Sequence, residues 1–356
     1  MNLEFLRSRI DELDRQMLEL LCERARCAQQ VWDIKRGNQT PVYVPERERE
    51  ILNRLVEANQ GPFPEEAICS IFREIISATR ALEKVVSVAF LGPRDTFSHM
   101  AALSVFGATA DYRPLPSFTD IFTEVERGRI DYGVVPVESS MGGAVSDILD
   151  LFITSDLNII NEVLIHVTQN LLAKCPLEQV QRVYSKDNAL IQCRGWLRAN
   201  LPRAELIEVA STSEAARRAA EEPTAAAIAS ALAAETYHLD ILAAGIEDAP
   251  HNYTRFFVVG RQKTRPTGHD KTAILLSIKD RPGALYHLLL PFYEAGVNLT
   301  RIESRPSKQK AWEYVFFIDF LGHVEDPNIK QTLDIITERA NMFKVLGSFP
   351  SSDRIE

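Results

Sequence analysis

The N-terminal stretch carries the feature that most constrains the fold, an apolar heptad seam that runs from Leu3 to Ile34. Apolar residues recur there at alternating spacings of three and four, which predicts one helix of more than about 30 residues. Gly37 then ends the helix. A helix with such a seam cannot stand alone, so we expect it to pack against another long helix supplied by a second subunit. The seam consists of Leu3, Leu6, Ile10, Leu13, Met17, Leu20, Cys27, Val31 and Ile34.

The pattern of the chain divides it into three blocks. Further helices are predicted over 46–58 and 65–84, so residues 1–84 form an all-α domain. From Val85, short β-branched runs alternate with helical segments to about residue 262, which indicates an α/β domain. A polar stretch, 261–270, reads as a linker. The last block, 271–349, follows the order βαββαβ of a ferredoxin-like α+β domain.

Composition excludes several classes of function. The chain has 356 residues and a net charge of -9, which argues against a nucleic-acid partner. Its five cysteines include no C-x-x-C pair, so neither a disulfide framework nor a zinc site is expected. We expect the protein to lie in a reducing compartment. The start lacks a signal-peptide pattern, and no apolar run reaches the length of a membrane span. We therefore expect a cytoplasmic protein.

Arg24 stands on the heptad seam where an apolar residue is expected. A buried guanidinium is costly unless an anion meets it. Lys35 lies about 20° around the helix from Arg24, so the two cations share one face, whereas Arg7 lies about 100° away and could reach only a partner's site. The second predicted helix adds Arg47 and Glu48. The third adds the i,i+4 pair Thr79 and Glu83. Salt bridges that hold a helical bundle together are the alternative explanation for any one of these residues.

These positions, taken with the sequence Arg47-Glu48-Arg49, resemble the all-helical chorismate mutase family over about 80 residues. The resemblance implies an intertwined, domain-swapped dimer. It also implies that Arg7 of one chain, with Arg24 and Arg47 of the other, binds the two carboxylates of chorismate. Glu48 would bind the ring hydroxyl, and Lys35 and Glu83 would flank the ether oxygen.

The mutase reaction is a pericyclic rearrangement, so a cation and a hydrogen-bond donor at the ether oxygen suffice. Two positions depart from the family. Val44 stands where many members have aspartate, and Glu83 stands where many have glutamine. A carboxylate donates a hydrogen bond only when protonated. We therefore expect Glu83 to act in its protonated form.

Polar clusters mark the ends of the predicted strands in the α/β block, where such folds bind ligands. Helix capping is the alternative for each cluster, and the preferred one for 211–213. Together the clusters resemble prephenate dehydratase over about 175 residues, including the segment Asn252-Tyr253-Thr254-Arg255-Phe256. The resemblance implies two α/β lobes of the periplasmic-binding-protein type with the site in the cleft between them.

The reaction implied is loss of carboxylate and hydroxide from prephenate. The resemblance implies that Thr254 helps the hydroxyl leave and that Arg255 binds a substrate carboxylate. Departures occur at Asp95, where the family has glycine, and at Ser139, where it has asparagine. No metal or organic cofactor is implied. The remaining polar shell consists of Thr96, Ser98, Ser139, Ser140, Ser185 and Gln192.

The C-terminal block carries two short motifs, 280–285 before a predicted helix and 303–306 at the end of a predicted strand. With the βαββαβ order they resemble an ACT domain of the dehydratase type, whose implied ligand is L-phenylalanine as a feedback inhibitor. An ordinary strand-to-helix turn would also explain the first motif. The implied ligand-binding residues are Gly283, Ala284, Leu285, Glu303, Ser304 and Arg305.

The sequence therefore predicts a bifunctional enzyme that converts chorismate through prephenate to phenylpyruvate. We expect a homodimer, with pairing of dimers left open. A non-catalytic amino-acid sensor built from these domains is the alternative, supported by Val44, Asp95 and Ser139 and opposed by the intact cations and the intact 254–256 segment. A solute-binding protein for transport is disfavoured by the fused helical block.

Overall fold

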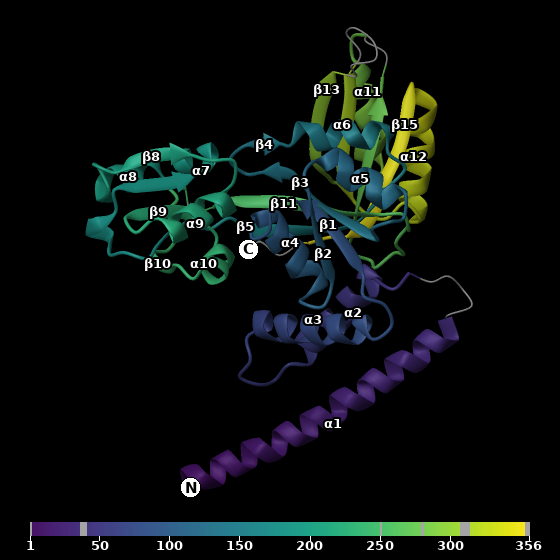
Figure 1. Ribbon diagram of the computed structural model, residues 1–356. Helices are drawn as coiled ribbons and strands as arrows, with labels where there is room; N and C mark the ends of the chain where they lie inside the picture. Colours follow the sequence, from purple (N-terminus) through teal and green to yellow (C-terminus); the bar gives the residue numbers. More distant parts are fainter. Residues whose placement is uncertain (1, 36–40, 250, 279–280, 307–313, 353–356) are drawn as a thin grey trace. The chain divides into compact units, whose positions relative to one another are not determined.

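The computed structural model describes residues 2–35, 41–249, 251–278, 281–306 and 314–352, except for the side chain of Lys35. Contacts divide the chain into two units. The helical unit comprises residues 1–86 and 106–111, and the larger unit comprises residues 87–105 and 112–356. Each is described by itself below. Figure 1 labels the elements of both.

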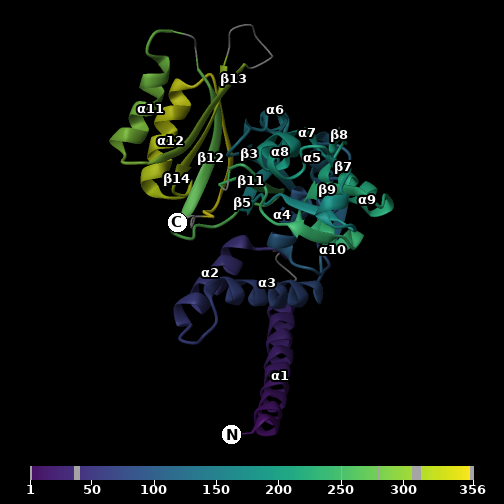
Figure 2. The same cartoon turned by 90° about the vertical axis from the view of Figure 1, so that its left-hand side faces the viewer.

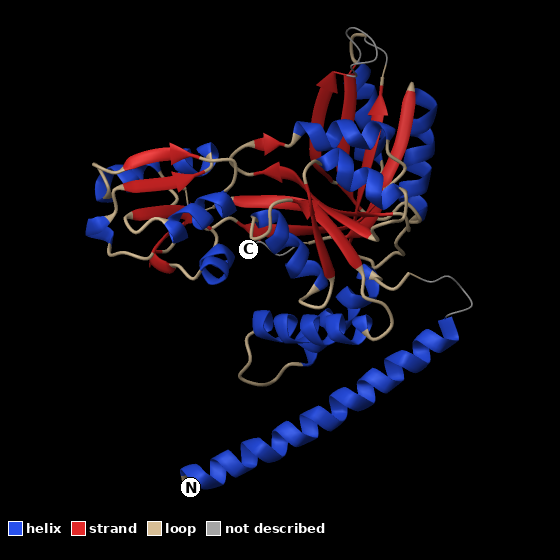
Figure 3. Ribbon diagram, viewed as in Figure 1, coloured by secondary structure: helices blue, strands red, loops and turns tan. Residues whose placement is uncertain are grey.

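The helical unit contains α1 (Leu3–Lys35), α2 (Pro45–Ala58) and α3 (Glu65–Ala81). Among its described residues before Ser87 there is no strand, and the three helices are coloured blue in Figure 3. The long helix predicted from the heptad seam is present, and its seam residues are exposed from Leu3 to Leu20. Pro45 occupies the first turn of α2, where its missing N–H costs nothing. The third helix is shorter than predicted, since it ends at Ala81 and leaves Glu83 in the following turn.

The segment 106–111 joins the helical unit through hydrogen bonds to α3. The carbonyl oxygen of Phe106 accepts from Ser77 Oγ at 2.6 Å and from Arg80 Nη2 at 2.7 Å. Glu74 accepts from the backbone N–H of Ala108 at 2.9 Å. The Phe106 ring packs on Tyr43 with centroids 4.7 Å apart. The helical unit is thus completed by residues that lie more than twenty positions beyond the end of α3.

The larger unit begins with a sheet of order β2-β1-β3-β11-β5, to which β4 pairs at β3. Strand β11 lies between β3 and β5 and is antiparallel to both, so a late segment of the chain completes the first lobe. Helices α5 and α6 contribute Phe122 and Phe152 to the core on the face of β11 that carries Phe257. The elements are β1 (Ser87–Leu91), α4 (Phe97–Phe106), β2 (Asp111–Leu115), α5 (Phe118–Glu126), β3 (Tyr132–Ser139), β4 (Gly143–Ala144), α6 (Ser146–Thr154), β5 (Asn158–His166) and β11 (Tyr253–Gly260).

A second lobe holds a five-stranded sheet of order β10-β6-β9-β7-β8. Its central strand, β9, is entirely buried and consists almost wholly of alanine, which lets α9 pack closely on it. Ser211 caps α9 by accepting from the backbone N–H of Glu214, which confirms capping as the role predicted for this serine. The elements are β6 (Asn170–Ala173), η1 (Leu177–Gln179), β7 (Arg182–Ser185), α7 (Asp187–Gln192), α8 (Arg194–Asn200), β8 (Glu205–Glu208), α9 (Thr212–Glu221), β9 (Ala225–Ala229), α10 (Ala231–Tyr237) and β10 (Asp240–Ala243).

The C-terminal part of the larger unit follows the βαββαβ order and forms a sheet of order β13-β14-β12-β15. Figure 2 shows α11 and α12 on one face of this sheet. The other face contributes Leu275 and Phe317 to the same core as Phe257 of β11. A Cβ on Gly347 would lie 2.1 Å from the carbonyl oxygen of Ile159, so only glycine fits where β15 crosses β5. The elements are β12 (Asp270–Ser277), α11 (Ala284–Glu294), β13 (Leu299–Pro306), β14 (Tyr314–Leu321), α12 (Pro327–Arg339) and β15 (Met342–Pro350).

Within the described ranges, none of the helices combines the length and the apolar character that crossing a membrane requires.

Candidate active sites

A pocket of about 160 Å³ lies among the three helices of the helical unit. Among the predicted mutase residues whose side chains are described, all except Arg7 line it. The lining comprises Arg24, Ala28, Val31, Trp32, Pro41, Val42, Val44, Arg47, Glu48, Ile51, Ile76, Thr79, Arg80 and Glu83. Three cations and two carboxylates, from three different helices and the turn after α3, therefore meet with Thr79 around one small space, as a site for a polar anion requires.

Arg24 and Thr79 contact each other directly in this pocket. Arg24 Nη1 donates to Thr79 Oγ1 at 2.9 Å, and Thr79 Oγ1 in turn donates to the carbonyl oxygen of Ile75 at 2.6 Å. Partial burial lowers the pKa of Arg24, but a guanidinium stays charged in proteins. The seam position that sequence analysis marked as anomalous thus places a positive charge in the pocket wall.

Arg80 is a charged residue of the pocket wall that sequence analysis missed. Its Nη1 donates to Glu48 Oε1 at 2.5 Å, and its guanidinium lies over the rings of Tyr43 and Phe106 at 5.3 and 5.6 Å from their centroids. Burial raises the pKa of Glu48, and the charge of Arg80 opposes that rise. The sequence did contain a clue to Arg80, because it directly follows Thr79 on α3 and a helical wheel places it near the same face as Thr79.

The remaining mutase positions differ in how they relate to the pocket. Arg47 lines the pocket while it donates to Glu50 at 2.6 Å along the exposed side of α2. Val44 also lines the pocket, so the departure from aspartate puts an apolar surface there. Arg7 is exposed on α1, seventeen residues before Arg24, which is about 25 Å along a helix axis. The side chain of Lys35 lies outside the described part of the chain.

In the larger unit, three predicted dehydratase residues, Ser139, Ser140 and Gln192, are tied to the N-terminal end of β11. Thr254 is paired in register with Ser139 of β3 and with Ile165 of β5. Ser140 joins the two strand ends, since its Oγ donates to the carbonyl oxygen of His251 at 3.1 Å and accepts from the Tyr253 N–H at 2.9 Å. Ser139 and Thr254 therefore lie side by side, and Ser140 holds the backbone that presents them.

Three side-chain amides meet next to this strand end. Gln192 Oε1 accepts from Gln169 Nε2 and from Asn252 Nδ2, each at 3.2 Å. Gln169 and Asn252 are buried, and the oxygens Gln169 Oε1 and Asn252 Oδ1 have no hydrogen-bond partner. Unpaired buried acceptors are costly and indicate a place where a donor group completes the network. Ser185 is also buried, and its Oγ donates to the carbonyl oxygen of Ile228 at 2.8 Å.

The turn before α4 shows why a glycine is usual where this chain has Asp95. Asp95 has φ of 65°, a left-handed conformation that aspartate tolerates better than most residues. Its carboxylate is buried 3.6 Å from His99 Nδ1, so it is turned toward His99. Burial lowers the pKa of His99, and Asp95 opposes that effect. Thr96 Oγ1 accepts from the His99 N–H at 3.4 Å, and Ser98 follows in the first turn of α4.

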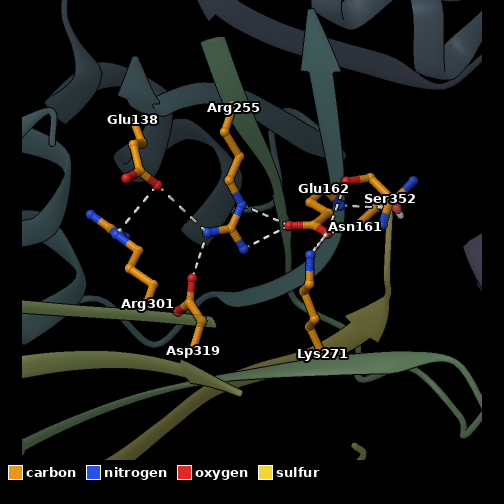
Figure 4. Close-up of polar contacts among 8 residues, drawn as sticks. All are labelled: Glu138, Asn161, Glu162, Arg255, Lys271, Arg301, Asp319 and Ser352. Atoms are coloured by element: carbon orange, nitrogen blue, oxygen red, sulfur yellow. Dashed lines mark hydrogen bonds and ion pairs between the residues drawn. The ribbon is translucent and has the colours of Figure 1, made fainter. Parts of the chain in front are cut away.

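Arg255 is surrounded by protein carboxylates (Figure 4). Its Nε and Nη2 lie 2.7 and 2.6 Å from Glu162 Oε2, and its Nη1 lies 2.5 Å from Asp319 Oδ2 and 4.0 Å from Glu138 Oε2. Burial lowers the pKa of Arg255, but Asp319 and Glu162 outweigh it, so the net shift is upward. The fork that the resemblance assigns to a substrate carboxylate faces Glu162 instead.

The predicted regulatory residues lie at one end of the C-terminal sheet. Strands β12 and β13 are both antiparallel to β14, so their C-terminal ends point the same way. Gly283, with φ of 77°, precedes α11, whose first residues are Ala284 and Leu285. Glu303, Ser304 and Arg305 end β13, and Arg305 Nη2 lies 3.7 Å from Asp150 Oδ2 of α6. Asp280 of the first motif lies outside the described residues.

Three family models match the chain in succession. They are chorismate mutase type II over residues 6–84, prephenate dehydratase over 88–264 and the ACT domain over 272–337. Each match covers the part of the chain in which the corresponding candidate residues lie.

Known proteins match both the whole chain and its larger part. A bifunctional chorismate mutase/prephenate dehydratase of Aquifex aeolicus is 49% identical over 98% of each chain, and one of Stutzerimonas stutzeri is 45% identical over the same shares. The crystal structure of an Arthrobacter aurescens prephenate dehydratase in complex with L-Phe is 35% identical, with a TM-score of 0.71 over 75% of this chain and 91% of that one.

A further solved structure shows that the fold of the larger part does not decide the activity. GqqA, described as a novel type of quorum quenching acylase, is 30% identical, with a TM-score of 0.69 over 74% of this chain and 98% of that one. Function is therefore assigned from the relatives that align with 98% of this chain. On that basis the chain belongs to the bifunctional chorismate mutase/prephenate dehydratases and carries a C-terminal ACT domain.

Proposed function

We propose that this bifunctional enzyme rearranges chorismate to prephenate in the pocket of the helical unit and converts prephenate to phenylpyruvate beside Thr254 on β11. The observation that carries the proposal is the pocket, because it brings Arg24, Arg47 and Glu48 together with Thr79. The proposed domains are residues 1–84 for the mutase, 85–262 for the dehydratase and 271–349 for the ACT domain.

The mutase residues divide into charge binders and groups at the ether oxygen. Arg24 and Arg47 would bind the chorismate carboxylates, with Thr79 holding the Arg24 guanidinium at 2.9 Å. Glu48 would accept the ring hydroxyl, and Arg80 would keep Glu48 oriented and ionised. Lys35 and a protonated Glu83 would stabilise the negative charge that develops on the departing oxygen.

A second copy of the chain would complete the mutase site. Arg7 is about 25 Å along α1 from the pocket of its own chain, so it could serve only a partner's pocket. The exposed seam of α1 gives such a partner a surface to bury, since Leu3, Ile10, Met17 and Leu20 are each more than half exposed. We propose an intertwined homodimer in which the two α1 helices pack along this seam.

Mixing two inactive variants tests the shared site. Arg7→Ala and Arg24→Ala should each lose most mutase activity as separate proteins. After the two are unfolded together and refolded, mixed dimers contain one pocket with both arginines, so roughly a quarter of the wild-type activity should return. Activity that stays at the level of the separate variants would show that Arg7 and Arg24 do not serve one pocket across the dimer.

For the dehydratase we propose that the Thr254 hydroxyl assists departure of the prephenate hydroxyl while the carboxylate leaves as carbon dioxide. Ser139, in register with Thr254, and Gln192 would bind polar groups of the substrate. Ser185, Ser140, Thr96 and Ser98 would shape the surrounding wall. The unpaired oxygens of Gln169 and Asn252 add two acceptors that a substrate hydroxyl can satisfy.

We further propose that L-phenylalanine binds the ACT domain near 283–285 and 303–305 and inhibits the dehydratase. The L-Phe complex of the Arthrobacter aurescens relative supports this ligand. Gly283 allows a close approach of the backbone at the start of α11, which suits a carboxylate.

One incubation tests both activities against the sensor alternative. The purified full-length protein is incubated with chorismate alone, quenched with alkali, and assayed for prephenate and phenylpyruvate beside a sample without enzyme. Phenylpyruvate above the control establishes both activities. Prephenate alone would contradict the dehydratase assignment, and unchanged chorismate would favour the sensor.

A further inference from the structure

Three side-chain amides from separate parts of the chain meet beside the N-terminal end of β11. Gln169 lies in the segment that leads from the first lobe into β6, and Asn252 lies in the segment that returns from the second lobe to β11. Gln192 ends α7 of the second lobe. Gln169 Nε2 and Asn252 Nδ2 each donate to Gln192 Oε1 at 3.2 Å. The three amides therefore join both crossings between the lobes to the end of one helix.

Two donors around one oxygen decide which way the Gln192 amide faces. A primary amide has an acceptor at one end and a donor at the other. Because its oxygen is bound by Gln169 and Asn252, Gln192 holds its Nε2 away from them. A half turn of this amide would bring its NH2 group against two other NH2 groups and would lose both hydrogen bonds. The neighbouring amides thus favour one orientation of Gln192, in which it presents a donor.

The two neighbouring amides are themselves held in place. Asn252 is 1% exposed and Gln169 is 3% exposed. The backbone carbonyl oxygen of Gln169 accepts from the Ile246 N–H at 2.8 Å, and that of Asn252 accepts from the Val167 N–H at 2.7 Å. A substrate group therefore meets an amide whose orientation is set before binding, which lowers the entropic cost of the contact.

The Gln192 amide lies on the face of β11 that carries Thr254. The hydrogen bond from Val167 continues the pairing of β11 with β5 as far as Asn252, so the chain is extended there. Side chains two residues apart on an extended chain point to the same face, roughly 7 Å from each other. Gln192 is bonded to the Asn252 side chain, so it reaches the side of the strand on which the Thr254 hydroxyl lies.

The donor end of Gln192 is free to meet a ligand. No residue in the described part of the chain accepts a hydrogen bond from Gln192 Nε2. Gln192 is also only partly buried, unlike Gln169 and Asn252. Prephenate carries two carboxylates, whose oxygens accept hydrogen bonds from an NH2 group. An amide whose oxygen is bound twice and whose nitrogen is free suits such an anionic ligand.

We propose that Gln169 and Asn252 are positioning residues for the dehydratase reaction, which hold the Gln192 amide with its Nε2 toward a carboxylate of prephenate. This rests on the proposed dehydratase function of the β11 end. Neither residue has to touch the substrate in this role, since each acts through Gln192. A reversed amide would place its oxygen against the substrate carboxylate, and two acceptors would then face each other.

Replacing a donor by an acceptor tests the proposal in the full-length protein. In Asn252→Asp a carboxylate replaces the donor, so Gln192 should turn its NH2 group toward it and its oxygen toward the substrate. The new charge also repels prephenate, so the same substitution is made in a Gln192→Met background, where only that charge effect remains. We expect Asn252→Asp to lower kcat/KM for prephenate by about tenfold or more beyond its effect in the Gln192→Met background.

Further measurements separate positioning from general damage. Asn200→Asp, at the exposed C-terminal end of α8, is the matched control and should leave kcat/KM unchanged. Mutase activity on chorismate and the Tm report on folding. The excess loss in Asn252→Asp should shrink as the pH is lowered, because a protonated carboxyl again donates a hydrogen bond. A sample without enzyme at each pH corrects for spontaneous conversion of prephenate.

Two outcomes would overturn the proposal. In the first, Asn252→Asp costs the same in both backgrounds, which would show that Asn252 does not act through Gln192. In the second, Asn252→Asp has wild-type kinetics, as expected if Gln192 donated to Asn252 and did not accept from it.

Gln169→Glu keeps the test valid if Asn252→Asp fails to fold. It reverses the other donor to Gln192 Oε1 by the same change of an amide to a carboxyl, and the same coupling with Gln192→Met is expected. Equal costs in the two backgrounds would again exclude a positioning role. A wild-type protein that makes no phenylpyruvate from prephenate would instead contradict the proposed function itself.

Discussion

The helical unit and the larger unit both bury arginine–carboxylate pairs, but they differ in what else those charges meet. Glu48 and Arg80 pair in the wall of a pocket that two further cations, Arg24 and Arg47, also line. Arg255 forms close ion pairs with Glu162 and Asp319, inside a cluster of three acidic and three basic side chains. An excess of one sign beside a pocket suits an anionic ligand, whereas a balanced, enclosed cluster suits a structural joint. The two units also differ in their surfaces, since α1 leaves an apolar seam exposed.

The largest effect is expected from placing charges on that seam. Ile10→Glu combined with Met17→Glu should prevent pairing of α1 and lower mutase activity on the order of 100-fold or more, because the partner's Arg7 is lost from each pocket. Dehydratase activity on prephenate should persist. Light scattering after size-exclusion chromatography and the two assays check this. Arg15→Glu, on the opposite side of α1, is the control, and a double variant with wild-type mutase activity would contradict the dimer.

Removing the cation behind Glu48 should have the next largest effect. Arg80→Met should lower mutase kcat/KM by about 100-fold, because it leaves a buried carboxyl without its partner. Burial already raises the pKa of Glu48 and Arg80 opposes it, so the variant's pKa rises further. If ionised Glu48 is the active form, mutase activity falls as the pH drops through the pKa of Glu48. Because that pKa is higher in the variant, the acid limb of its pH–rate profile should lie at higher pH than in the wild type.

The pH–rate profiles of Arg80→Met and of Arg54→Met, an exposed arginine on α2, provide the measurement and its control. Identical acid limbs in the two variants would show that Arg80 does not tune Glu48.

A smaller effect, of a few fold, is expected at Glu83. A carboxyl group donates to the ether oxygen only when protonated, so wild-type mutase activity should decline at alkaline pH. Glu83→Gln, which donates at every pH, should flatten that decline with a modest change in the maximum rate. Mutase rates measured from pH 5 to 9 test this, and an unaltered profile in the variant would refute the role of Glu83.

The smallest effect concerns thiol reactivity. Cys22 and Cys27 are exposed on α1, whereas burial, assisted by Glu247 and Asp248, raises the pKa of Cys193 to about 12. Iodoacetamide should label Cys22 in the native protein and Cys193 only after unfolding, because the thiolate is the reactive form. Peptide mass spectrometry measures this. Native labelling of Cys193 would mean that the second lobe opens more readily than its packing indicates.

Periodicity sufficed to predict the long helix, the three blocks and the βαββαβ order, because each depends on local apolar spacing. Short strands such as β6 and β10 escaped prediction, since a four-residue strand leaves little pattern. In the mutase pocket, Arg24 was found because it interrupts a seam. Arg80 was missed because its partner Glu48 lies 32 residues away and its other contact, Phe106, lies in a different block.

Arg255 shows a different limit of sequence analysis. Its motif marked it as important, but a carboxylate that it meets, Asp319, lies 64 residues further on. Only the packing of the ACT sheet against β11 brings that carboxylate to it. The role of a charge is decided by its neighbours, and these are set by tertiary contacts that no local pattern encodes.

The hydrogen bonds from Ser77 and Arg80 to Phe106 bear on how a gene for this protein can be divided. A stop codon after residue 84 would give a chain that ends where the family pattern ends. Such a fragment would lack the acceptor of two buried donors and the ring on which Tyr43 and Arg80 lie. A mutase fragment expressed from this gene should therefore extend through residue 111, so that Ser77 and Arg80 keep the carbonyl oxygen of Phe106.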